Sequence, residues 1–448
     1  MKTNDRMETY RNIIEEIRAA KTLPQKIEHL YHTAKKEGKT ELFQSAMLEC
    51  YAETPDNLLY AAWFYRIQQA EAGLEKHPRG INWAWAVPLS ILTGLIFWAL
   101  SDFQNTTILD HLPHLFLWWS PVATMSALIF MVMTARKNIV RGVALGLGLL
   151  ATSAYVILLA PSLGAPTKVN YYLDLAAIHI PLLCWLALGI SVLGFKSTTE
   201  NRFAFLIKSI EVMITAGLYL IAGVAFGGIT VGMFSALNIT LSDLWLRLII
   251  AGGFGLLPVL AIASVYDPTV APGEQDFNQG LSKFIATMMR LLLPLTLGVL
   301  VIYIFVIPFN FMEPFKNRDV LIVYNLMLFA IMGLLLGATP IRVGDLSPQL
   351  QKWLRYGIIV VAILAELISL YALSATVFRT IDGGITINRL TILGWNTINI
   401  AILLWLLIKQ FKTDRQKWVE ALQAVFALAT NAYLIWALFL VLLIPWLF

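Results

Sequence analysis

Long apolar runs separated by short polar loops dominate the chain from residue 82 onward. Each run holds about 20 residues, which is the length an α-helix needs to cross the ~30 Å hydrocarbon core of a bilayer. Only helices and closed barrels satisfy their backbone hydrogen bonds in lipid, and barrel strands are shorter and alternate in polarity. The pattern therefore predicts an all-α, polytopic membrane protein with about eleven transmembrane helices. The runs lie near residues 82–101, 113–134, 139–160, 171–195, 206–233, 244–266, 284–309, 320–339, 354–377, 388–409 and 418–447.

The first 80 residues follow a different pattern, in which apolar residues recur every three or four positions among charged ones. This spacing is typical of amphipathic helices. Pro24 and Pro55 help to divide the segment into about four helices, with Thr54 as a candidate N-cap. We therefore predict a small N-terminal cytosolic helical bundle at residues 1–80 and a transmembrane domain at residues 81–448.

Composition and charge support this division. The chain has 58% apolar and 14% charged residues and a formal net charge of +5, whereas average globular proteins carry roughly 25% charged residues. With alternating loops and the N-terminus inside, the inner segments of the transmembrane part carry 15 Lys and Arg and the outer segments carry 6. This bias predicts a cytoplasmic N-terminus, an outer C-terminus and insertion in the inner, cytoplasmic membrane. The positive charge is thus a topology signal that suits the lipid bilayer as partner, and no nucleic acid partner is expected.

One carboxylate, Glu366, lies deep in a predicted span. It is 11 residues from Arg355 and 13 from Arg379, which at ~1.5 Å per residue places it about 16 Å and 20 Å from these positions. A charge at this depth costs roughly 2.5–3.5 kcal/mol on insertion scales, so we expect the carboxyl group to be protonated, paired or hydrated. Polar residues expected at similar depth are Asn396, Asn399, Asn431 and His179. They would form either a proton- or substrate-linked site or a hydrogen bond that holds helices together.

Three other charged residues are predicted nearer the membrane surfaces. Glu211 lies one helical turn from Lys208, and Arg247 lies one turn past Asp243, within reach of the interface. Arg290 lies further into its span and is a borderline case.

Motifs of known enzymes are missing from the sequence, which has no Walker loop, no H-E-x-x-H and no G-x-S-x-G. Two histidine clusters, one at His29 and His32 and one at His111 and His114, are short of the three or four ligands of a tight metal site. We therefore predict no metal, no cofactor and no enzymatic activity.

Small residues suggest close helix packing. Four G-x-x-x-G pairs predict packing within the chain or a homo-oligomer, and they are Gly142/Gly146, Gly223/Gly227, Gly228/Gly232 and Gly333/Gly337. Glycine clusters at residues 227–232 and 252–255, together with several prolines, also predict interruptions of the spans.

Three short motifs lie between residues 200 and 410. They are Arg290 followed by a Leu-rich run to Pro294, Tyr371-Ala-Leu, and Gly384-Ile-Thr386 running on to Arg389. With these motifs the chain resembles an uncharacterised family of bacterial multi-pass membrane proteins, described as a domain of unknown function. It departs from the family pattern in having Gly-Ile-Thr rather than Gly-Leu-Thr, and in its helical head. The resemblance implies a bacterial integral membrane protein in which Pro294, Tyr371, Thr386 and Arg389 are structurally important, and it implies no activity.

These observations lead to two functional hypotheses. The first is a transporter- or permease-like protein with a mid-membrane polar site around Glu366. The alternative is a membrane-embedded sensor, assembly factor or scaffold whose cytosolic head binds a protein partner. An intramembrane enzyme ranks third, because it would need a second deep ionisable group or metal ligands.

Overall fold

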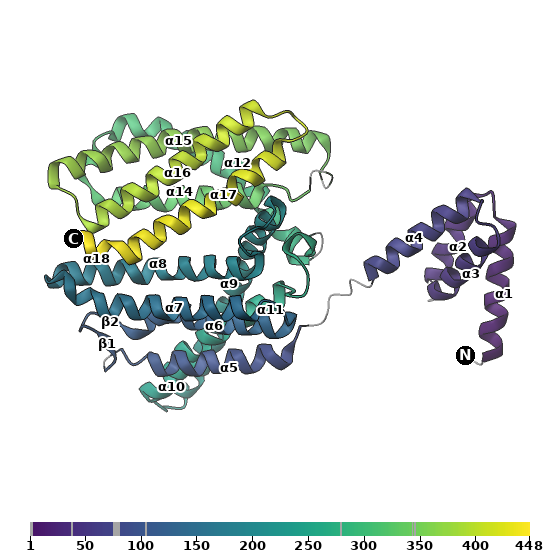
Figure 1. Cartoon of the computed structure of the whole chain (residues 1–448), viewed down its shortest axis with the longest axis horizontal. Coiled ribbons are helices and arrows are strands. Elements are labelled where there is room, and N and C mark those ends of the chain that lie inside the picture. The colour runs from purple at the N-terminus through teal and green to yellow at the C-terminus, as the bar shows by residue number, and fades with distance from the viewer. Residues whose placement is uncertain are drawn as a thin grey trace. The chain divides into compact units, whose positions relative to one another are not determined.

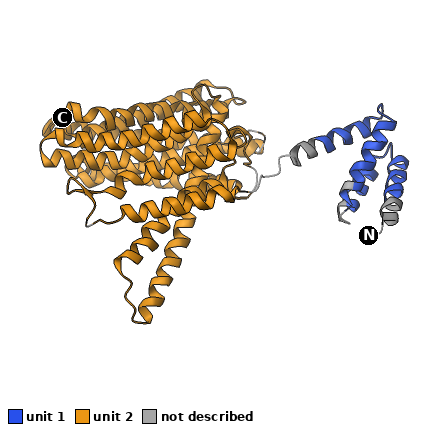
Figure 2. Ribbon diagram, turned by 60° about the horizontal axis from the view of Figure 1, so that its bottom comes forward, with its two compact units in different colours: residues 1–80 blue, residues 81–448 orange. Residues whose placement is uncertain are grey.

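The structure divides the chain into two compact units. A computed structural model describes residues 3–36, 39–74, 81–103, 105–277, 280–342, 344 and 346–448. Unit 1 is Met1–Gly80 and unit 2 is Ile81–Phe448 (Figure 2).

Unit 1 is a bundle of four helices. They are α1 (Thr3–Ala19), α2 (Pro24–Lys36), α3 (Thr40–Glu53) and α4 (Leu58–Leu74). Their apolar faces enclose Ile17, Phe43 and Trp63, each at most 5% exposed. The guanidinium of Arg66 lies 4.3 Å from the Trp63 ring centroid and donates a 2.7 Å hydrogen bond to Glu28. A cation–π contact on α4 and an ion pair between α4 and α2 therefore stabilise the bundle.

The start of α4 differs from the prediction. Thr54 does not cap this helix, because its hydroxyl donates back to the carbonyl of Cys50 at the end of α3. Asn57 is the cap instead, and its Oδ1 accepts the backbone N–H groups of Leu59 and Tyr60. Asparagine is among the preferred N-cap residues.

Unit 2 is a helical bundle, which confirms the predicted all-α polytopic fold. Among the described residues, eleven helices are long and apolar enough to cross a membrane. In chain order they are α5 (Trp83–Leu100), α6 (His114–Ala135), α7 with η1 (Ile139–Leu163), α8 (Pro166–Leu193), α9 (Thr199–Ala236), α10 to α11 (Asp243–Val265), α12 with η4 (Gly280–Asn310), α14 (Arg318–Ala338), α15 (Pro348–Gly383), α16 (Ile387–Lys412) and α17 to α18 (Trp418–Leu447).

These helices run back and forth between two ends of unit 2 (Figure 1). We call the end at which α5 begins the proximal end and the opposite end the distal end. The distal end carries one small element that the sequence pattern did not predict, an antiparallel pair of β1 (Thr107–Ile108) and β2 (Leu112–Pro113). Short connections complete the unit, namely η3 (Pro272–Glu274) and α13 (Glu313–Lys316).

The predicted interruptions of the spans are largely absent. Helix α9 continues through residues 227–232, and α12 continues through Pro294. Span six does change its winding, with a π-helical turn η2 at Leu248–Gly252. Gly255, which follows, serves packing, because a Cβ on this residue would lie 2.6 Å from the Cα of Gly94 on α5.

The G-x-x-x-G pairs fall into two groups. Gly142 and Gly146 let α7 approach α6, since a Cβ at Gly146 would lie 2.6 Å from the Met125 side chain. Gly223 and Gly228 on α9 have no side chain or neighbouring backbone within 4 Å of an added Cβ. Gly337 of the fourth pair also serves packing within the bundle, since a Cβ there would lie 2.9 Å from the Met289 side chain on α12.

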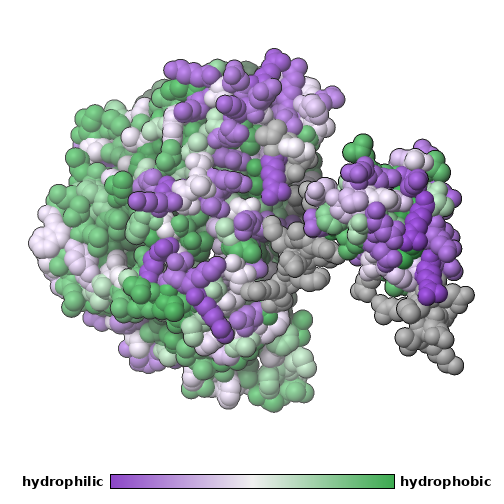
Figure 3. Space-filling model, turned by 45° about the vertical axis from the view of Figure 1, so that its right-hand side comes forward, coloured by the Kyte–Doolittle hydropathy of each residue, from purple (hydrophilic) through white to green (hydrophobic). Residues whose placement is uncertain are grey.

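The outer faces of the spans are apolar. Helix α9 from residue 218 onward is mostly exposed, with Phe226 at 74%, and it forms with α10 a hairpin that projects from the other helices (Figure 2). With the proximal end turned forward, hydrophilic side chains of unit 2 gather toward that end and the flank is largely hydrophobic (Figure 3). An apolar flank between polar ends is the surface expected of a protein in contact with a bilayer.

Candidate functional site

Four polar residues share one level in the middle of unit 2. His179, Glu366 and Asn399 each lie within one residue of the midpoint of α8, α15 and α16. Tyr433 lies equally close to the midpoint of the last span, Trp418–Leu447. The middle of α15, where Glu366 lies, is thus matched by polar groups in the middle of three further spans, of which α16 packs against α15.

Three of these residues take part in a hydrogen-bonded aromatic cluster. His179 is 6% exposed, and its Nε2 accepts a 2.9 Å hydrogen bond from Trp395 Nε1. The Trp395 ring lies 5.5 Å from the Tyr433 ring, and the Tyr433 hydroxyl donates a 2.7 Å hydrogen bond to Asn399 Oδ1. A continuous chain of contacts therefore links α8, α16 and α17. We call His179, Trp395, Tyr433 and Asn399 the aromatic cluster.

Glu366 faces the interior of the bundle and has no hydrogen-bond or ion-pair partner among the described residues. It is 8% exposed, and its Oε2 is buried without a hydrogen bond. The register of α15 against α16 is given by Arg355, whose Nη2 donates a 2.6 Å hydrogen bond to the carbonyl of Gln410. Glu366 and Asn399 lie 11 residues from these two positions, in the antiparallel sense, so they occupy the same height and nearly the same helical faces.

The two asparagines on α16 are also incompletely bonded. Asn396 is 3% exposed and Asn399 is fully buried, and within the part of the chain that the structure describes the Nδ2 of each has no hydrogen-bond partner. Buried polar groups in proteins normally find partners. A carboxylate oxygen and two amide N–H₂ groups are therefore buried near the middle of unit 2 without a hydrogen-bond partner among the described residues, and we call Glu366, Asn396 and Asn399 the mid-span site.

Asn431 does not join this arrangement. Its side chain is exposed on α17, whereas Tyr433, two residues further on, points to Asn399. Sequence reasoning did not identify Tyr433 or Trp395. A usable signal was present, because a tryptophan inside a span rather than at the interface needs a partner for its N–H.

Two of the three charges predicted near the surfaces, Glu211 and Arg247, form ion pairs within the protein. Lys208 Nζ lies 2.7 Å from Glu211 Oε2, and the side chains are 5% and 3% exposed. Arg247 lies at the distal end, 3.1 Å from Asp102 and 3.5 Å from Asp243. Hydrogen bonds from Asn105, together with Arg247, hold the pKa of Asp102 below its usual range. These groups are structural ion pairs.

Arg290 and the motif residues of the family resemblance lie at several places. Arg290 is half-buried on α12, and Pro294 is exposed one turn further on. The Tyr371 hydroxyl donates a 2.6 Å hydrogen bond to the carbonyl of Phe311. Thr386 is the N-cap of α16 and accepts the backbone N–H of Arg389, so these two residues shape the turn into that helix.

The histidine clusters noted in the sequence make pairwise contacts. His32 lies 3.4 Å from Glu28, and His111 lies 2.9 Å from Asp174. Within the described ranges no group of three or more His, Cys, Asp and Glu side chains is placed to hold a metal ion.

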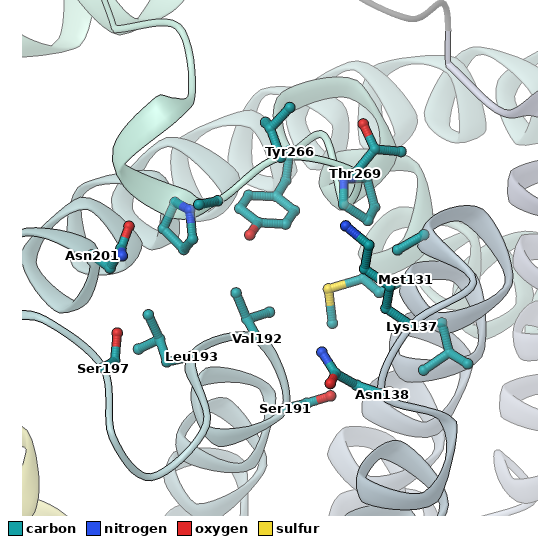
Figure 4. Close-up of a pocket in the computed structure, with 16 residues that line it drawn as sticks. Met131, Lys137, Asn138, Ser191, Val192, Leu193, Ser197, Asn201, Tyr266 and Thr269 are labelled. Atoms are coloured by element: carbon teal, nitrogen blue, oxygen red, sulfur yellow. The ribbon is translucent and has the colours of Figure 1, made fainter.

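A cavity of about 250 Å³ opens at the proximal end, between the ends of α6, α8 and α11. The ring of Tyr266 and the side chains of Lys137, Asn138 and Asn201 surround it (Figure 4). Burial raises the pKa of Tyr266, so this hydroxyl is a neutral hydrogen-bonding group. The lining of this cavity does not include Glu366.

The fold and the position of the polar groups define a multi-pass α-helical membrane protein. No family model matches the chain, and comparison with curated proteins and with solved structures found no similar protein.

Proposed function

We propose that this chain is a permease-like transport protein of a bacterial cytoplasmic membrane, with its proximal end in the cytoplasm. The observation that carries the proposal is the mid-span site, in which Glu366, Asn396 and Asn399 have buried polar atoms without hydrogen-bond partners among the described residues. The charge bias between the two ends supports the orientation.

The energetics favour a ligand-binding role over a structural one. A carboxyl group that only joined helices would be hydrogen-bonded to a neighbour, and each such bond contributes ~0.6 kcal/mol on average. Glu366 Oε2 makes no such bond, although placing the charged group at the bilayer centre costs about 2.5–3.5 kcal/mol on insertion scales. Buried polar groups left without protein partners at this cost are suited to bind a proton, a cation or a polar solute during transport.

Access to the mid-span site from water is the first test. In a full-length chain with Cys50 and Cys184 replaced by alanine, Glu366→Cys should react with a charged, membrane-impermeant methanethiosulfonate reagent added from either side of the membrane. Ala365→Cys is the matched control, because Ala365 is fully buried in the bundle core and should stay unreacted. Reaction of Glu366→Cys from one side only, or from neither, would contradict alternating access.

Proton movement is the second test. In liposomes that contain the full-length chain and a pH-sensitive dye, we expect a potassium diffusion potential to drive proton flux. Glu366→Gln should lower this flux at least tenfold, because the amide cannot take up a proton, and Asn431→Leu should leave it unchanged. Equal flux through the wild type and Glu366→Gln would reject proton coupling at this residue.

A second candidate function is a sensor or assembly factor that binds a protein through unit 1. It is favoured by Leu58 and Tyr65, which are 87% and 59% exposed and lie seven residues apart on one face of α4. Deleting residues 1–80 distinguishes the two functions, since a transporter should keep its flux without unit 1. A homo-oligomer through the exposed part of α9, where Gly223 and Gly228 have open space beside them, would fit either function.

A further inference from the structure

A second cavity lies at the distal end of unit 2. It has a volume of about 260 Å³ and lies between α8, α14, α15 and α16. Its charged and polar lining residues are Arg318, Arg379, Arg389, Thr376, Thr386 and Asn388. Among the described residues neither Asp nor Glu lines this cavity, so three guanidinium groups share it without a carboxylate in its lining. We call it the arginine cavity.

The fold fixes two of these arginines near the turn between α15 and α16. Arg389 Nη1 donates a 2.7 Å hydrogen bond to the carbonyl of Gly384, whose φ of +75° favours glycine. Gly383 leaves room for this guanidinium, since a Cβ there would lie 2.5 Å from Arg389 Nη1. Arg379 lies one turn before the end of α15, and its Nη1 is buried without a hydrogen-bond partner.

The three arginines of the cavity form no ion pair within the described part of the chain, whereas Arg247 at the same end has two carboxylates within 3.5 Å. The first turn of α16, which reaches the cavity, has no acidic residue. The partial positive charge of that helix N-terminus therefore adds to the guanidinium charges.

We infer that the arginine cavity binds a phosphate group, carried either by a small solute or by the headgroup of an anionic lipid. Guanidinium groups present planar pairs of N–H donors that match phosphate oxygens bidentately. A volume of about 260 Å³ suits a small group of this kind, since pockets for larger ligands span about 300–1,000 Å³. This binding proposal can be tested separately from the transport proposal, because phosphate or lipid binding is measured without any flux.

The test uses the full-length protein in a neutral detergent. Inorganic phosphate should raise its unfolding temperature more than chloride at equal ionic strength, and Arg379→Gln should weaken the apparent affinity at least tenfold, because hydrogen bonds to charged groups are the strong ones. Lys316→Gln is the matched control, since it removes a positive charge at the same end outside the cavity. In a parallel arm, phosphatidylglycerol retained after purification is measured by native mass spectrometry.

Free phosphate binding assigns the site to a solute, and retained phosphatidylglycerol without phosphate binding assigns it to a lipid. In either case Gly383→Ala should reduce binding, because its added Cβ displaces the Arg389 guanidinium while every charge remains. Circular dichroism verifies that the helices of each variant are intact. Absence of both forms of binding in the wild type, or an equal loss in Lys316→Gln and Arg379→Gln, overturns the proposal.

Discussion

Replacing Lys208 with methionine should destabilise unit 2 by about 3–5 kcal/mol, because it leaves the Glu211 carboxylate buried without its charge partner. The Lys208 ammonium lies 2.7 Å from Glu211 Oε2 and donates a 2.7 Å hydrogen bond to the carbonyl of Asp276. Methionine keeps much of the volume of the lysine chain beside Phe277, so the loss should be electrostatic. The double variant Lys208→Met/Glu211→Met removes both charges and should recover most of the lost stability. Its free energy of unfolding should stay ~1 kcal/mol below that of the wild type, because the hydrogen bond to Asp276 is lost.

The assay is a double-mutant cycle on the full-length protein in mixed micelles. Reversible unfolding by a denaturing detergent, followed by circular dichroism, gives the free energy of unfolding for wild type, both single variants and the double variant. We expect a coupling energy of at least about 2 kcal/mol between the two positions. A Lys208→Met variant within about 1 kcal/mol of wild type, or a double variant no more stable than the weaker single variant, would refute the reasoning.

Three further predictions use the same measurement or its equivalent. Asn399→Leu should lower the free energy of unfolding by ~0.6–1.7 kcal/mol by leaving a buried tyrosine hydroxyl without its acceptor, whereas exposed Asn431→Leu should not; the reverse order would contradict the assigned faces. Gly255→Ala should cost about 1–3 kcal/mol by pushing α11 away from the α5 backbone, and Gly253→Ala, with open space around it, is the control that should stay near wild type. Trp63→Ala should cost about 3–5 kcal/mol in unit 1, seen as faster amide hydrogen exchange in α3 and α4, and unchanged exchange there would disprove the role of this ring in the core.

The number of spans and the position of polar residues along them follow from hydropathy and charge spacing in the sequence. Eleven spans follow from run length, because the bilayer sets the number of apolar residues that a helix needs. The same arithmetic put Glu366 and Asn399 at mid-span, since helical rise converts residue number directly into depth. Depth along the membrane normal is therefore a property of the sequence alone.

Which face of each helix points inward was decided by the tertiary structure. Asn431 and Tyr433 have nearly the same depth, yet packing of α17 turns Tyr433 inward and leaves Asn431 exposed. Within the hydrocarbon core there is no water to draw the polar face of a helix outward, so the hydrophobic effect does not set its rotation. The rotation of the helix about its axis depends instead on close packing with neighbouring helices. For the same reason glycines predicted to break spans instead mark where α11 meets α5.

The arginine cavity depends most on the tertiary structure. Arg318, Arg379 and Arg389 come from three different helices, and along the chain they are only three of six positive charges at one end. Spacing gives their common depth, and packing of α14, α15 and α16 brings the three guanidinium groups to one cavity. The sequence thus determined how far each group lies along the membrane normal, and the packing of side chains between helices determined which groups meet in the plane.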